Sequence, residues 1–232
     1  NAEQGIYFDN VDNSTISGNY VGTNAAGTGD VNGAVANTAQ SGVFLTNGSS
    51  GNVIGGTSAG ARNVLSGNNH FGFEVINATS QNNLLQGNYI GTDATGLVAL
   101  GNINGGAVFW GAGTGNVFGG GAAGARNVIA GNYNGVVIGN ASSGATVQGN
   151  YIGTDITGAV ALSNTVDGVT VYGAAGNVIG GTNAGARNII SGNGERGVLV
   201  LAGARANLIM GNYIGTTASG AGSLGNRFSG VG

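Results

Sequence analysis

The chain has 232 residues, of which 51 are glycine and only 6% are charged, and it contains no proline and no cysteine. Glycine at this level without a strict triplet repeat excludes collagen, and the lack of proline argues against a disordered linker. The net charge of −3 argues against nucleic acid or an anionic membrane as a partner, and no apolar run approaches the length of a membrane span.

The sequence is an internal repeat, which is typical of a solenoid or a related stacked architecture. The motif GNY[V/I]GT begins at Gly18, Gly87, Gly149 and Gly211, and the last two intervals are equal. Each long unit holds two shorter ones, because a glycine followed by alternating apolar residues recurs throughout the chain. These opening glycines are Gly5, Gly42, Gly72, Gly106, Gly135, Gly168, Gly197 and Gly230.

One repeat, residues 168–193, shows what each unit forms. VTVY alternates between apolar and polar positions as a strand does, and NVIGG and NIISGN are two further short strands after glycine-rich turns. Helices are disfavoured, since glycine interrupts every longer run and costs roughly 1 kcal/mol in a helix interior. The pattern predicts an all-β parallel β-helix of about seven coils, each with three short strands. At about 4.8 Å per coil the rod is on the order of 34 Å long.

Apolar residues occupy the first and third positions after each opening glycine, so these positions are predicted to point inward. They are Ile6 and Phe8, Val43 and Leu45, Phe73 and Val75, Ala107 and Phe109, Val136 and Ile138, Val169 and Val171, and Val198 and Val200. A core that runs the whole length of the rod follows from this pattern.

The repeat resembles the right-handed parallel β-helix superfamily with the pectate-lyase-like fold, over nearly all of residues 5–232. The resemblance implies the fold, and right-handedness agrees with the usual crossover rule. It does not fix the function, because lyases, hydrolases, epimerases, phage spikes and binding modules share this fold. We expect one β-helix domain over residues 1–232. Neither terminus shows an amphipathic capping helix, so we also expect a fragment of a longer multi-domain secreted protein.

Residues that recur in every unit are predicted to be structural. The asparagines of the GN motif are expected to form one stacked column, bonded along the rod. They are Asn19, Asn68, Asn88, Asn132, Asn150, Asn193 and Asn212. Asp93 and Asp155 are predicted to be turn residues whose side chains bond their own backbone, with a calcium-binding loop as the open alternative.

Two further sets of recurring residues, arginines and tyrosines, are also predicted to be structural. The arginines of the AGARN motif are predicted to clamp loop carbonyls, and the tyrosines of GNY to pack against the long arm that follows each of them. These residues are Arg62, Arg126 and Arg187, and Tyr20, Tyr89, Tyr151 and Tyr213.

The catalytic patterns of enzymes with this fold are missing from the sequence. The paired aspartates, Gly-His-Gly and Arg-Ile-Lys motifs of polygalacturonase-like hydrolases do not occur, nor does the aspartate cluster of pectate lyases. The single histidine, His70, has no paired carboxylate in the sequence and is a poor candidate for a general base. We therefore predict a protein that is not an enzyme, with no cofactor and no metal ligands.

The informative positions are those that break the repeat. The second and fourth positions after each opening glycine point outward, and this face is unusually apolar and aromatic, which favours an interaction site. Trp110, the only tryptophan, and Tyr172 share one column two coils apart, about 9.6 Å from strand to strand, which suits alternate sugars of one β-linked chain. The candidate ligand-binding residues are Trp110, Tyr172, Phe44, Glu74, Tyr7, Thr46 and Thr170. Alternatively, the long arms, a neighbouring domain or a second copy cover this face.

The preferred hypothesis is a non-catalytic carbohydrate-binding module that recognises a plant cell-wall polysaccharide, with xylan favoured. Its partners are then the polysaccharide and a catalytic domain appended in the parent chain, in a secreted or cell-surface bacterial protein. A structural stalk or adhesin segment is the first alternative. The second is a polysaccharide lyase or hydrolase with an unfamiliar site around Glu74 and Asp9.

Overall fold

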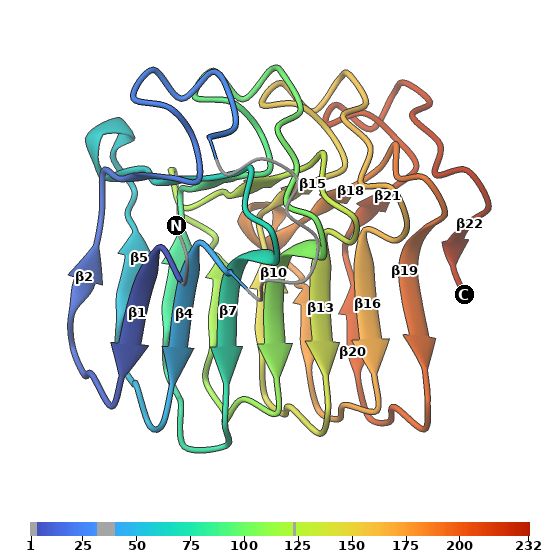
Figure 1. Cartoon of the computed structure of the whole chain (residues 1–232). Helices are drawn as coiled ribbons and strands as arrows, with labels where there is room; N and C mark the ends of the chain where they lie inside the picture. Colours follow the sequence, from blue (N-terminus) through green and yellow to red (C-terminus); the bar gives the residue numbers. More distant parts are fainter. Residues whose placement is uncertain (1–3, 32–39, 123) are drawn as a thin grey trace.

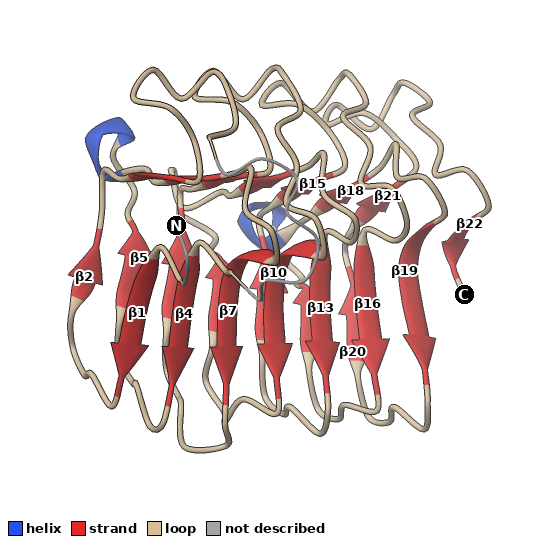
Figure 2. Ribbon diagram, viewed as in Figure 1, coloured by secondary structure: helices blue, strands red, loops and turns tan. Residues whose placement is uncertain are grey.

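The computed structural model describes residues 4–31, 40–122 and 124–232 and confirms the predicted architecture. The described chain winds through seven complete three-stranded coils and begins an eighth, as a right-handed parallel β-helix (Figure 1). Figure 2 shows that strands and connecting loops make up almost everything, apart from the single-turn helices η1 (Ala59–Ala61) and η2 (Ala184–Ala186). No helix of this described part is long and apolar enough to span a membrane.

Each coil contributes one strand to each of three parallel sheets. Sheet A holds β1 (Ile6–Asp9), β4 (Val43–Thr46), β7 (Phe71–Ile76), β10 (Gly105–Trp110), β13 (Val136–Gly139), β16 (Val169–Tyr172), β19 (Arg196–Leu201) and β22 (Ser229–Val231). Sheet B holds β2 (Thr15–Ile16), β5 (Val53–Gly55), β8 (Leu84–Gln86), β11 (Val117–Gly119), β14 (Thr146–Gln148), β17 (Val178–Gly180) and β20 (Leu208–Met210). Sheet C holds β3 (Tyr20–Val21), β6 (Val64–Leu65), β9 (Tyr89–Ile90), β12 (Val128–Ile129), β15 (Tyr151–Ile152), β18 (Ile189–Ile190) and β21 (Tyr213–Ile214).

The register of sheet A follows the repeat position by position. Ile6 pairs with Val43, Val43 with Phe73 and Ala107 with Val136, so the predicted inward columns lie in line along the rod. The inward residues of the five central coils are buried, whereas Ile6, Phe8 and Val200 at the two ends are half-buried. Burying each large aliphatic or aromatic side chain contributes about 1.5–3 kcal/mol.

The opening glycine of each coil is required by the close approach of neighbouring coils. A Cβ on Gly106 would lie 2.7 Å from the carbonyl oxygen of Gly135 and 2.6 Å from a methyl group of Ile129. A side chain there would push both the next coil and the sheet C core away. This steric demand explains why a glycine opens every coil.

The recurring asparagines form ladders, as predicted, but at three corners of the coil rather than in one column. Within each ladder the Nδ2 of one asparagine donates to the Oδ1 of the next, over 2.8–3.2 Å. The corner between sheets A and B holds Asn52, Asn83, Asn116, Asn177 and Asn207. The corner between sheets B and C holds Asn19, Asn63, Asn88, Asn127, Asn150, Asn188 and Asn212. The corner between sheets C and A holds Asn68, Asn102, Asn132, Asn164, Asn193 and Asn226.

One ladder has a gap at the fifth coil. Ala145 occupies the asparagine position between Asn116 and Asn177, and only its backbone nitrogen bonds the next coil, 3.0 Å from Asn177 Oδ1. Ala145 is buried, and its methyl group can neither donate nor accept a hydrogen bond. The side-chain ladder at this corner is therefore two separate segments.

The long arms follow the tyrosines of sheet C and stack on one another along the top of the rod (Figure 1). The arm that contains Ala94 donates from that residue's backbone nitrogen to Gly27 O over 2.9 Å, and the later arms repeat the contact from Ile156 to Gly96 and from Ala218 to Gly158. Asp93 stabilises its own arm, since its Oδ1 accepts from the backbone nitrogens of Leu97 and Val98. Asp155 bonds Ala159 and Val160 in the same way, which confirms both aspartates as turn residues.

The tyrosine and arginine predictions are confirmed together. The ring of Tyr89 packs against Gly96 in the arm that follows it, while the guanidinium of Arg62 lies 4.1 Å from the centre of that ring. Arg62 Nε also donates to the carbonyl oxygen of Gly87 over 3.3 Å. Arg126 on Tyr151 and Arg187 on Tyr213 repeat this arrangement, so each arginine clamps the next long coil.

Candidate functional site

The outer face of sheet A carries an exposed aromatic pair. Trp110 at the end of β10 is 42% exposed and Tyr172 at the end of β16 is 46% exposed. Their rings are stacked, with centroids 6.1 Å apart and planes 16° apart. This pair of residues is called the Trp–Tyr platform below.

The predicted spacing of the platform is wrong, and the reason is Gly139. The two residues are two coils apart, but their rings lean toward each other across the intervening strand β13 instead of standing about 9.6 Å apart. Gly139 sits between them in register, and a Cβ there would overlap the Trp110 ring. The face therefore presents one joined surface rather than two separate stacking positions.

A shallow hollow of about 380 Å³ adjoins the platform at the carboxyl ends of the sheet A strands. Its lining residues are Ile76, Asn77, Ala78, Trp110, Gly111, Asn140 and Ala141. Asn140 is exposed, and its side-chain amide makes no hydrogen bond to any other described residue. Asn77 is tied down, because its Nδ2 donates to Thr46 Oγ1 and to Asn47 Oδ1 over 2.9 Å each. An apolar ring surface thus lies beside one unpaired amide.

A second aromatic pair lies at the other end of the face. Tyr7 and Phe44 are stacked with centroids 5.5 Å apart, and Tyr7 is 52% exposed. The Tyr7 hydroxyl donates to Asp9 over 3.3 Å, and Asn47 Nδ2 donates to the same carboxylate over 2.8 Å. Asp9 therefore holds the side chains of Tyr7 and Asn47 in place.

Glu74 belongs to a three-residue cluster between the two pairs, a contact that the sequence analysis missed. Ser41 Oγ donates to Glu74 Oε2 over 2.6 Å, and His70 Nδ1 lies 3.2 Å from that hydroxyl and 3.3 Å from the carboxylate. The expectation that His70 has no carboxylate partner is therefore wrong. Ser41 and Glu74 contact each other directly and meet the same ring nitrogen, whereas a catalytic relay needs the imidazole between them.

The hydroxyl groups of both candidate threonines already make hydrogen bonds within the fold. Thr46 is 4% exposed and its hydroxyl accepts from Asn77, while Thr170 Oγ1 donates to Asp167 Oδ2 over 3.4 Å. Val108, on the same outward face, is only 1% exposed, so the outward face is not uniformly open. Asp167 also accepts from Arg196 N over 3.1 Å, a contact that no repeated motif signals.

In the part of the chain that the structure describes, the second and third long arms do not lie over this face, contrary to one of the alternatives. They lie over sheet C, where Ala94 and Ile156 pack against a small second core of Val64, Tyr89 and Val128. Burial there raises the pKa of Tyr89 above its ordinary value, and the Arg62 guanidinium opposes that rise.

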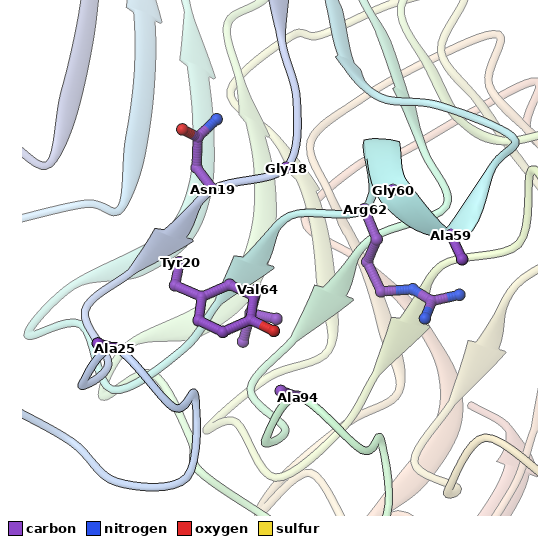
Figure 3. A pocket seen from close by; sticks show the side chains of 9 residues that line it. All are labelled: Gly18, Asn19, Tyr20, Ala25, Ala59, Gly60, Arg62, Val64 and Ala94. Atoms are coloured by element: carbon purple, nitrogen blue, oxygen red, sulfur yellow. The ribbon is translucent and has the colours of Figure 1, made fainter.

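Another hollow, of about 570 Å³, lies under the first two arms (Figure 3). It is lined by Gly18, Asn19, Tyr20, Ala25, Ala59, Gly60, Arg62, Val64 and Ala94. The repeat gives no signal of this hollow, because three of the four arms carry alanine at the position of Ala94, with Ala25 and Ala218 as its counterparts, and only the third carries isoleucine, Ile156.

No group of three or more metal-ligating side chains lies close together in the ranges that the structure covers. Comparisons with protein-family models, with curated proteins and with solved structures find no match to this chain. The geometry of its own surfaces is therefore the basis for any functional proposal.

Proposed function

We propose that the chain is a carbohydrate-binding module that holds a polysaccharide against the Trp–Tyr platform. The observation that carries the proposal is the platform itself, two exposed rings stacked side by side next to a hollow with an unpaired amide. Aromatic faces offer large apolar area at low entropic cost, and pyranose rings have apolar C–H faces that match them. Asn140 supplies the polar contact that orients a bound sugar.

The lining of the hollow favours a neutral glycan. Its described lining residues carry no charged side chain, so a uronate polymer gains nothing electrostatic there. Xylan is the preferred plant cell-wall ligand, ahead of mixed-linkage glucan, with pectin and alginate as the acidic comparisons. In this proposal the module is part of a secreted or cell-surface bacterial protein with an appended catalytic domain.

Affinity electrophoresis in native gels that contain each polysaccharide tests the proposal. We expect xylan to retard the chain and Trp110→Ala to lose at least tenfold in affinity, about 1.4 kcal/mol. Tyr133→Ala is the matched control, because Tyr133 is also an exposed aromatic residue, at 50%. Retardation that Trp110→Ala leaves intact contradicts the proposed site.

The stalk alternative has its own supporting observation, the three asparagine ladders and the stacked arms that stiffen the rod. In that case the platform is an assembly contact between copies. Sedimentation velocity separates the two functions: concentration-dependent association that Trp110→Asp abolishes, with no retardation by any glycan, favours the stalk.

A further inference from the structure

The turn that follows the sheet A strand begins in the same way in each of the seven complete coils. Its first residue is left-handed, with φ between 52° and 75°. Asparagine adopts this conformation more readily than most residues that have a side chain, and it is the commonest residue here. These positions, called the turn row below, are Asn10, Asn47, Asn77, Gly111, Asn140, Gly173 and Ala202.

Neighbouring asparagines of the turn row bond one another through their side chains. Asn77 Nδ2 donates to Asn47 Oδ1 and to Thr46 Oγ1, over 2.9 Å each, so the amide of Asn77 is fixed in orientation. Its Oδ1 accepts no hydrogen bond from any other described residue. The row therefore stops at Asn77 with an amide oxygen that is held in place and still able to accept.

Gly111 interrupts the turn row between Asn77 and Asn140. The hollow of about 380 Å³ beside the Trp–Tyr platform lies at this point, and all three residues line it. A Cβ on Gly111 would lie 3.3 Å from Asn140 Nδ2, and within the described chain that amide makes no side-chain hydrogen bond. The hollow thus occupies the place of a missing asparagine side chain, between an unused acceptor and an unused donor.

The other walls of the hollow are apolar. Ile76, Ala78 and Ala141 line it with methyl groups, and the exposed Trp110 ring lies at its edge. A group that fits this space has an amide, a small apolar part and a neighbouring ring with an apolar face.

We propose that the hollow takes the acetamido group of an N-acetylated amino sugar whose pyranose ring stacks on Trp110. An acetamido group carries an amide, as the asparagine side chain does. Its carbonyl oxygen accepts from Asn140 Nδ2, its N–H donates to Asn77 Oδ1, and its methyl group packs on Ala78 and Ala141. A hydroxyl in the same place has no methyl group for the apolar walls.

This inference rests on the proposed function, because both use the Trp–Tyr platform, and it names the sugar that the adjoining hollow selects. Xylan remains the preferred ligand among plant cell-wall glycans. A chain of β-linked N-acetylglucosamine is expected to bind more tightly than xylan does.

Titration of the whole chain with three β-linked trisaccharides tests the inference. Calorimetry measures the affinity, and fluorescence locates the ligand, because Trp110 is the only tryptophan. Triacetylchitotriose and cellotriose differ only in the substituent at the second ring carbon, and xylotriose represents xylan. We expect triacetylchitotriose to bind at least about tenfold more tightly than either of the others. Equal affinities overturn the inference and leave the platform as a glycan site, whereas no heat and no fluorescence change with any of the three overturns the proposed function as well.

Gly111→Asn completes the turn row and fills the hollow with the chain's own amide. The φ of 65° at Gly111 suits asparagine, as it does at Asn77 and Asn140, so the fold is expected to be retained. We expect this variant to lose the preference for triacetylchitotriose. Ala202→Asn is the matched control, because it adds the same side chain to the turn row outside the hollow, at a φ of 58°, and is expected to keep the preference.

Asn140→Asp tests the donor by itself. The substitution keeps the shape of the side chain but replaces Nδ2 with an oxygen, which cannot donate to the acetamido carbonyl. We expect the affinity for triacetylchitotriose to fall at least about tenfold and the affinity for cellotriose to change far less. Full preference for triacetylchitotriose in either Gly111→Asn or Asn140→Asp would overturn the proposal.

Discussion

Aromatic residues lie on two outer surfaces of this rod, and the two surfaces treat them differently. On sheet C, tyrosines recur in every second coil, and Tyr89 and Tyr151 are almost fully buried between an arm and an arginine. On sheet A, Trp110 and Tyr172 occur once each, stack on one another and remain more than 40% exposed. The recurring tyrosines Tyr89, Tyr151 and Tyr213 are packed by an arm and an arginine that recur with them. Trp110 and Tyr172 do not recur, no such partners cover them among the described residues, and they remain available to a ligand.

The largest expected effect comes from removing a recurrent partner. Asn127 is buried, donates to Leu85 O and to Asn150 Oδ1, and accepts from Asn88. Asn127→Ala leaves several buried polar groups unpaired, so we expect the free energy of unfolding to fall by about 3 kcal/mol. Urea denaturation followed by circular dichroism measures this change.

Asn104→Ala is the matched control for that experiment. Asn104 is exposed, its side-chain amide makes no hydrogen bond to another described residue, and its backbone is not left-handed, so its loss is expected to cost less than about 0.5 kcal/mol. Equal losses for the two variants would show that the ladder contributes nothing beyond an ordinary surface asparagine.

A smaller effect, of opposite sign, is expected where the repeat can be completed. Ala145→Asn supplies the missing amide between Asn116 and Asn177, at a buried position whose counterparts in other coils hold asparagine. We expect a gain of about 1 kcal/mol, the usual net value of a hydrogen bond. A higher midpoint of urea denaturation is the expected result. A lower midpoint would mean that the corner of the fifth coil is packed too tightly around alanine to hold an asparagine side chain.

The smallest stability effect is expected on the interrupted surface. Gly139→Val places a side chain between the two rings of the platform, and the ring of Trp110 is exposed and can rotate away. We expect the free energy of unfolding to change by less than about 1 kcal/mol. The near-ultraviolet circular dichroism of Trp110 is expected to change clearly, together with any glycan retardation.

Val137→Thr is the control. It changes a residue on the same strand, β13, whose side chain does not lie between the rings of Trp110 and Tyr172. Its near-ultraviolet spectrum and its retardation are expected to match those of the parent chain. If Gly139→Val leaves the spectrum unchanged as well, the stacked arrangement of Trp110 and Tyr172 is wrong.

The fold was predictable because its determinants repeat. The period-two pattern after each opening glycine gives the inward columns of sheet A, and Ile6 pairs with Val43 as that pattern requires. The pattern placed the GN asparagines in one column, because equal motifs carry no information about which corner they occupy. Asn19 and Asn68 in fact belong to different ladders.

The candidate site was less predictable because it depends on side chains that occur once. The strand spacing gives the distance between the backbones that carry Trp110 and Tyr172, but the rings meet because Gly139 leaves room between them. The cluster of Ser41, His70 and Glu74 joins residues from two coils that no motif links. Both features arise from side-chain conformations, which the period does not encode.

The contacts between stacked arms determine how many coils can be added to or removed from such a rod at once. Each arm bonds the arm two coils away, and each arginine clamp joins a short coil to the long coil after it. A duplication or deletion of one coil breaks both contacts at the new seam, whereas a change of two coils restores them. We therefore expect duplications to be retained in pairs of coils, which would change the length of the rod by multiples of about 9.6 Å.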